Sequence, residues 1–65
     1  MKYTVDALID LEMRLGAAAC PDGQRTVRDE RLALQVATQR RDTARIVALS
    51  AEATRVARMW EPYAA

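Results

Sequence analysis

A few side chains in this sequence have types and spacings that could support catalysis or metal binding. Asp6, Asp10 and Glu12 could act as acid–base groups or cation ligands, and Cys20 is a potential nucleophile. A metal site needs more ligands than these carboxylates supply, and the chain has no histidine to complete a zinc site or to activate a thiol. We therefore expect a solvated acidic helix start and a packing cysteine, with no catalytic residue, metal or cofactor, in a protein that is not an enzyme.

Arginines in the second half could contact phosphates or an acidic protein surface. The candidates for charged contacts are Arg41, Arg45, Arg55 and Arg58, with Arg40 beside them. Asp42 and Glu52 interrupt this row, and charge runs are usually solvated helix faces. The net charge of +1 is also far from the basic excess of a dedicated nucleic-acid binder. A nucleic-acid-binding regulator that uses the arginines of residues 40–58 is therefore the alternative to a protein-binding function.

An apolar seam in residues 46–60 is the most informative pattern. Its members recur at spacings of three and four, as in a coiled coil, and are Ile46, Leu49, Ala53, Val56 and Trp60. Met59 and Tyr63 adjoin them, and Trp and Tyr are enriched at binding hot spots. These residues together form the predicted dimer or partner interface. The alternative is that Trp60 only closes the end of a core.

These candidate residues lie on predicted helices. The first helix is predicted over residues 4–19, with Thr4 as N-cap and an apolar stripe of Val5, Leu8, Leu11 and Leu15, widened by Ile9 and Met13. The sequence Pro21-Asp22-Gly23 predicts a turn over residues 20–25. A long helix should then run over residues 26–61, from the N-cap Thr26 to the stop at Pro62.

The middle of the long helix carries apolar residues on two different sides. Leu32, Ala33, Val36 and Ala37 share one side, and the seam that begins at Ile46 lies roughly 150–180° away on a straight helix. Two interpretations explain this change. Either the chain breaks near residues 41–43 and forms a three-helix bundle, or one continuous helix packs residues 27–37 on the first helix and the seam on a partner. No Gly or Pro marks a break, so the continuous helix, in a homodimeric bundle of helical hairpins, is preferred.

The whole chain is predicted to be a single small all-α domain, residues 1–65. So short a chain has a marginal core, and its lone cysteine cannot form an internal disulfide, which favours association with a second copy or a larger protein. The N-terminus, residues 1–6, lacks a signal-peptide pattern and no apolar stretch could span a membrane, so a cytoplasmic location is expected. The bias toward arginine and alanine is common in products of GC-rich bacterial and phage genomes. The predicted function is a non-enzymatic protein–protein interaction module: a small regulator, adaptor or inhibitor.

Overall fold

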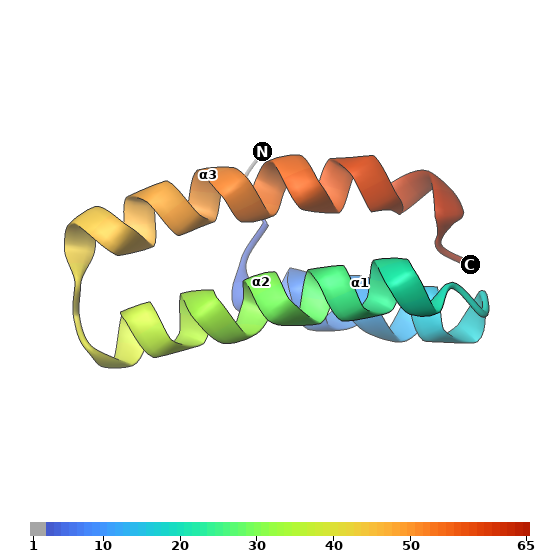
Figure 1. Cartoon of the computed structure of the whole chain (residues 1–65), viewed down its shortest axis with the longest axis horizontal. Coiled ribbons are helices and arrows are strands. Elements are labelled where there is room, and N and C mark those ends of the chain that lie inside the picture. Colours follow the sequence, from blue (N-terminus) through green and yellow to red (C-terminus); the bar gives the residue numbers. More distant parts are fainter. Residues whose placement is uncertain (1–2) are drawn as a thin grey trace.

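The computed structural model describes residues 3–65, which form three consecutive antiparallel helices and a final helical turn (Figure 1). The elements are α1 (Val5–Ala17), α2 (Pro21–Gln39), α3 (Thr43–Trp60) and the 3-10 turn η1 (Glu61–Tyr63). The predicted all-α class is confirmed. The preferred continuous helix over residues 26–61 is wrong, and the alternative three-helix bundle with a break near 41–43 fits the structure. Met1 and Lys2, part of the N-terminal stretch without a signal-peptide pattern, lie outside the described residues.

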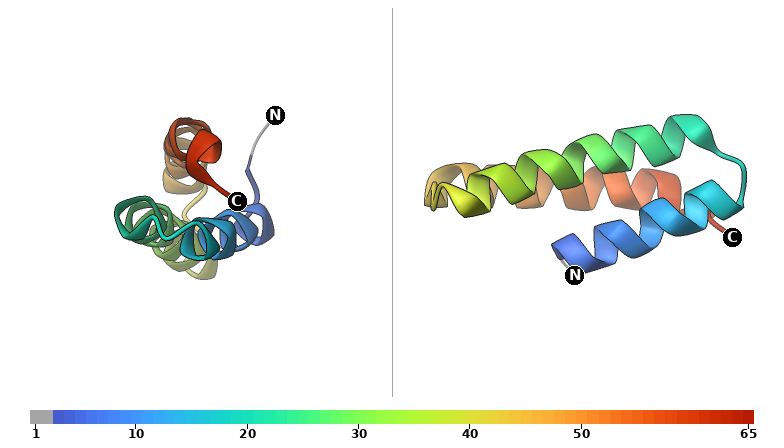
Figure 2. Two further views of the ribbon diagram at one scale, coloured as in Figure 1. Left: turned by 90° about the vertical axis from the view of Figure 1, so that its right-hand side faces the viewer. Right: turned by 90° about the horizontal axis from the view of Figure 1, so that it is seen from below.

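Helix α1 forms much as its sequence pattern predicts. The Thr4 hydroxyl accepts a hydrogen bond from the Ala7 N–H at 3.2 Å and so caps the helix start. Leu8, Leu11 and Leu15 are completely buried. With 13 residues, α1 is shorter than α2 and does not reach the α2–α3 turn (Figure 2).

The first turn lies earlier than its Pro and Gly residues predict. Pro21 begins α2 instead of forming a turn, because proline lacks an N–H and has the backbone angle that the first helical position needs. The chain reverses at Ala19, whose φ of 54° lies in the left-handed region. Cys20 N–H donates to the Leu15 carbonyl, which ends α1. Thr26, the predicted N-cap, is inside α2 and its hydroxyl donates to the Asp22 carbonyl at 2.8 Å.

The second turn breaks the predicted long helix without a glycine. Arg41 adopts a left-handed φ of 55°. Its N–H donates to the Thr38 carbonyl and that of Asp42 to the Ala37 carbonyl, the hydrogen-bond pair that commonly terminates helices. The Asp42 side chain then accepts from the Arg45 N–H and starts α3. Hydrophobic burial explains this break, because the reversal brings the apolar sides of α2 and α3 to one interior.

Arg41→Gly is expected to stabilise the protein by about 1 kcal/mol, since glycine adopts the left-handed conformation without the steric cost that other residues carry. In a continuous helix the same change would destabilise by a similar amount. Urea unfolding distinguishes the two signs. Ala51→Gly, at an exposed position within α3, is the control and should cost about 1 kcal/mol. A loss of stability in Arg41→Gly would contradict the observed break.

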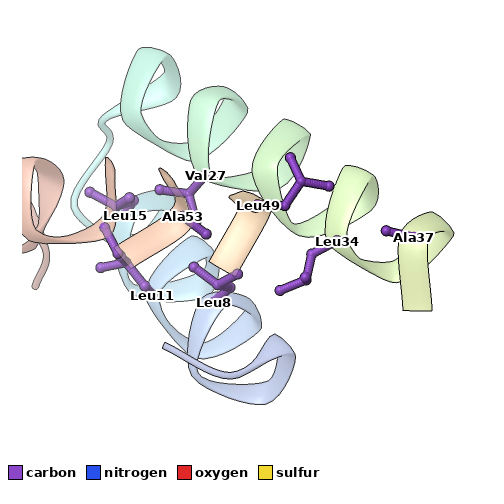
Figure 3. Close-up of a cluster of buried hydrophobic side chains, with 9 residues drawn as sticks. Leu8, Leu11, Leu15, Val27, Leu34, Ala37, Leu49 and Ala53 are labelled. Carbon is purple, nitrogen blue, oxygen red and sulfur yellow. The ribbon is translucent and has the colours of Figure 1, made fainter. Parts of the chain in front are cut away.

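The core lies between the three helices and is built from leucines and small residues (Figure 3). Its members are Leu8, Leu11 and Leu15 of α1, Val27, Leu34 and Ala37 of α2, and Leu49, Ala53 and Ala57 of α3. The predicted apolar side of α2 is therefore partly wrong. Ala37 is buried and Ala33 half-buried, but Leu32 and Val36 are each 45% exposed. Leu34 is buried in their place, because α1 and α3 both pack on its side of the helix.

Candidate protein-binding face

The predicted interface seam is largely used inside the chain. Leu49 and Ala53 belong to the core, and Ile46, Val56 and Trp60 pack against it as half-buried residues. Only Met59 and Tyr63 are mainly exposed, at 60% and 62%. In this fold the seam therefore packs on α2 and α1 of the same chain. A second protein has access to only a few of its members.

Trp60 closes one end of the bundle, as the alternative interpretation of this residue predicted. Its ring lies directly over Gly23 of α2: a Cβ atom on Gly23 would stand 2.6 Å from Trp60 Cε3 and 3.2 Å from Cys20 Sγ. The Tyr63 ring packs beside it with a centroid separation of 5.5 Å. The Cys20 thiol is free and half-buried here, so it packs as expected from the sequence.

A polar cluster joins α1 to the C-terminal end of α3. Glu61 accepts hydrogen bonds from Arg14 Nη1 at 2.6 Å and from Tyr3 Oη at 2.9 Å. Arg14 also binds Asp10 at 2.9 Å. The hydrogen bond from Arg14 lowers the pKa of the Glu61 carboxyl, and the hydrogen bond to Glu61 raises the pKa of Tyr3. These charges are compensated within the chain, so the cluster holds helices together.

The charges between α1 and α2 are also paired internally. Arg31 binds both carboxylate oxygens of Glu12, at 3.0 and 3.2 Å, and each side chain is only 17% exposed. Gln35 accepts a further hydrogen bond from Arg31. Glu12 and Asp10 are thus partners of arginines, whereas Asp6 is exposed at the start of α1. The predicted solvated acidic helix start is therefore right for Asp6 and Asp10, which are exposed, and wrong for Glu12, which packs against α2 because Arg31 neutralises its charge.

A different surface, here called the α2–α3 face, carries charges that the chain leaves largely uncompensated. Glu30 and Glu52 interact across the two helices on the side turned away from α1, since Arg31, the residue after Glu30, faces α1 instead. Helix periodicity aligns further residues with these two. The α2–α3 face comprises Asp29, Glu30, Ala33 and Val36 of α2, Arg40 directly after α2, and Arg45, Ala48, Glu52 and Met59 of α3.

The basic end of this face lies at the α2–α3 turn. Arg40, Arg41 and Arg45 are exposed, and none forms an ion pair with the described residues. By contrast, Arg55 approaches Glu52 at 4.0 Å, and Arg58 interacts within the chain. Of the predicted charged contacts, Arg41 and Arg45 are therefore the two whose charge has no acidic partner in the described chain.

The acidic middle of the face lacks adequate counter-charge. Burial, followed by the neighbouring Glu52 carboxylate, raises the pKa of Glu30. The nearest ion pairs are long and weak: Arg55 to Glu52 at 4.0 Å and Arg28 to Asp29 at 3.9 Å. One surface thus presents excess positive charge at the turn and excess negative charge about three helical turns away.

Glu30→Gln is expected to raise the free energy of unfolding at neutral pH by roughly 0.5 kcal/mol, the cost of a like-charge pair on a helix surface. Because the folded-state pKa of Glu30 is raised, the folded chain binds this proton more tightly than the unfolded chain. The contribution of Glu30 to the free energy of unfolding is therefore most favourable at acidic pH, and it falls as pH rises through the raised pKa. Urea unfolding of the native protein and of Glu30→Gln should be measured from acidic to neutral pH, at concentrations where the chain is monomeric. The difference between their free energies of unfolding should grow with pH. A constant difference would contradict the pairing.

The described residues show no other feature of a small-molecule or metal site. Residues 3–65 enclose no detectable pocket and contain no group of three potential metal ligands. No helix within these residues is both long enough and apolar enough to cross a bilayer.

Comparison with protein-family models, curated proteins and solved structures found no match to the chain. Its class therefore rests on its own fold, an all-α bundle of three short antiparallel helices. Any function must accordingly be inferred from the surface that this fold presents.

Proposed function

We propose that the protein is a non-enzymatic interaction module, a small regulator, adaptor or inhibitor that binds protein through its α2–α3 face. The observation that supports this most is that one face carries charges of both signs that have either no ion pair or only a long one within the described chain. Arg40 and Arg45 lie at its basic end, and Asp29, Glu30 and Glu52 lie in its middle.

A mixed charge pattern favours a protein partner over a nucleic acid. A phosphate backbone would be attracted to the arginines of the turn but repelled by the adjacent carboxylates. A protein surface can present both signs and can also cover Val36 and Met59, which are 45% and 60% exposed. Interfaces commonly combine such apolar residues with arginine.

Site-specific photocrosslinking in an extract of the native host tests this proposal. A photoreactive residue at position 36 should form protein adducts, and the same residue at position 47 should not. Val36 and Val47 are both exposed, at 45% and 60%, but Val36 belongs to the α2–α3 face, whereas Val47 lies on nearly the opposite side of α3 from Arg45 and Glu52. The combined substitutions Arg40→Glu and Arg45→Glu should abolish the adducts. Equal crosslinking at both positions, or no protein adduct at 36, would refute binding through this face.

Nucleic-acid binding through the arginines of residues 40–58 is the competing proposal. It requires binding to random duplex DNA at low salt, with an affinity that falls steeply as salt is added, since phosphate contacts release counterions. Fluorescence anisotropy of labelled DNA measures this. Strong salt-dependent binding that Arg41→Ala and Arg45→Ala weaken would replace the protein-binding proposal.

The expected homodimer is retained as a proposal, but on a different surface from the predicted seam. Leu49 and Ala53 already serve the core of one chain and are not accessible to a second one. Self-association must therefore use exposed residues. The α2–α3 face carries such residues, and the charges on it suggest how two copies would be oriented.

A further inference from the structure

Opposite charges recur along each helix of the α2–α3 face at spacings that place them in line. Asp29 of α2 and Arg40, the residue that caps the end of α2, are eleven positions apart, and Arg45 and Glu52 are seven positions apart on α3. Separations of seven and eleven residues each return to nearly the same side of a helix. Each helix thus shows one basic residue near the turn and one acidic residue farther from it.

Two contacts fix how α2 and α3 are aligned along their length. Trp60 lies over Gly23, and Glu52 interacts with Glu30. Leu34 follows Gly23 by eleven positions on α2, and Leu49 precedes Trp60 by eleven positions on α3. Both leucines are in the core. Leu34 therefore lies level with Leu49, and residue 35 lies level with residue 48.

The two charge pairs have their midpoints at the same level. The midpoint of Asp29 and Arg40 falls between residues 34 and 35, and that of Arg45 and Glu52 falls between residues 48 and 49. One two-fold axis that crosses the hairpin at this level and lies in the plane of the α2–α3 face would exchange the basic and acidic members of both pairs.

We propose that the α2–α3 faces of two copies pack together about this axis, with α2 against α2 and α3 against α3 in antiparallel orientation. This inference rests on the proposed protein-binding function and names the partner of that face as a second copy of the chain. Arg40 meets the partner's Asp29, and Arg45 meets the partner's Glu52. Because the interface is isologous, each ion pair forms twice.

The residues near the axis suit close helix packing. Ala33 and Val36 of α2 and Ala48 of α3 lie around its level, and small side chains allow two helices to approach each other. The association would cover Val36, which the single chain leaves 45% exposed. It would also bring the partner's Arg45 to the Glu52 carboxylate, whose ion pair within the chain, to Arg55 at 4.0 Å, is long.

Reversal of single charges tests the arrangement. The native chain should dimerise in sedimentation equilibrium, and Arg45→Glu or Glu52→Arg alone should each raise the dimer dissociation constant at least about tenfold, because like charges then meet twice. The double variant Arg45→Glu with Glu52→Arg should restore dimerisation. Asp6→Arg, the same charge change as Glu52→Arg but at an exposed position on α1, should have little effect. Circular dichroism of each variant confirms that these exposed substitutions leave the helices folded.

Several results would overturn the proposal. A native chain that is monomeric at millimolar concentration refutes it, as does a dimer whose affinity neither single reversal alters or that the double variant fails to restore. A monomeric chain that still crosslinks a different protein at position 36 would refute the second copy as partner while leaving the protein-binding function intact. A native dimer whose only adduct at position 36 has twice the mass of the chain would support both the second copy as partner and the protein-binding function.

Discussion

Leu49→Asp is expected to unfold the protein at every concentration. Leu49 is only 8% exposed and belongs to the core between the three helices. An unpaired charge in such a site costs at least about 3 kcal/mol, and a core of this size rarely supplies more than about 3–5 kcal/mol in total. The helical signal in circular dichroism should therefore be lost at 25 °C.

This result separates the observed fold from the seam-mediated dimer that the sequence suggests. If residues 46–60 formed an intermolecular seam, Leu49→Asp would dissociate a dimer and leave folded helical hairpins. Val47→Asp is the matched control, because Val47 lies two positions away and is 60% exposed. Its stability should stay within about 0.5 kcal/mol of the native value. A helical Leu49→Asp monomer would show that the seam is not part of the intrachain core.

Gly23→Ala is expected to destabilise the protein by about 1–2 kcal/mol. In an exposed helix interior this change gains about 1 kcal/mol of helix propensity. At Gly23, however, the new methyl group would lie 2.6 and 2.9 Å from two carbons of the Trp60 ring. Overpacking of this kind typically costs about 1–3 kcal/mol because the bulky ring and α3 must move. Urea unfolding monitored by Trp60 fluorescence measures the loss.

Gly16→Ala provides a control of opposite sign. A Cβ atom on Gly16 would also meet a neighbour at 2.6 Å, but that neighbour is the terminal amide nitrogen of Gln24. A flexible side chain can turn aside at little cost, so helix propensity should dominate and stabilise the protein by up to about 1 kcal/mol. If Gly23→Ala stabilised equally, Trp60 could not be packed closely on α2.

The candidate face could be predicted only in part from the sequence. Of the residues predicted for charged contacts or the interface, Arg45 and Met59 belong to the proposed face and are exposed. The acidic residues of the face were missed, although the spacing of opposite charges was visible in the sequence. That spacing predicts a shared surface only once the alignment of α2 with α3 is known. The alignment depends on contacts such as that of Trp60 with Gly23.

The local features of this protein can be predicted from its sequence alone. The all-α class, the Thr4 cap, the leucine stripe of α1 and the apolar spacing of residues 46–60 follow from interactions between residues a few positions apart. Such signals need no knowledge of the rest of the chain. They also revealed that the apolar sides before and after residue 41 point in different directions.

The packing of the three helices explains why the apolar sides point in different directions. Leu32 with Val36 and Leu34 with Ala37 both satisfy helical spacing, and the positions of α1 and α3 select the second pair for burial. Arg41 is a poor residue for a left-handed turn, but the cost of about 1 kcal/mol is smaller than the gain from burying Leu49 and its neighbours, at roughly 1.5–3 kcal/mol for each large apolar side chain. Burial in the chain's own core therefore outweighs local preference and turns the seam inward.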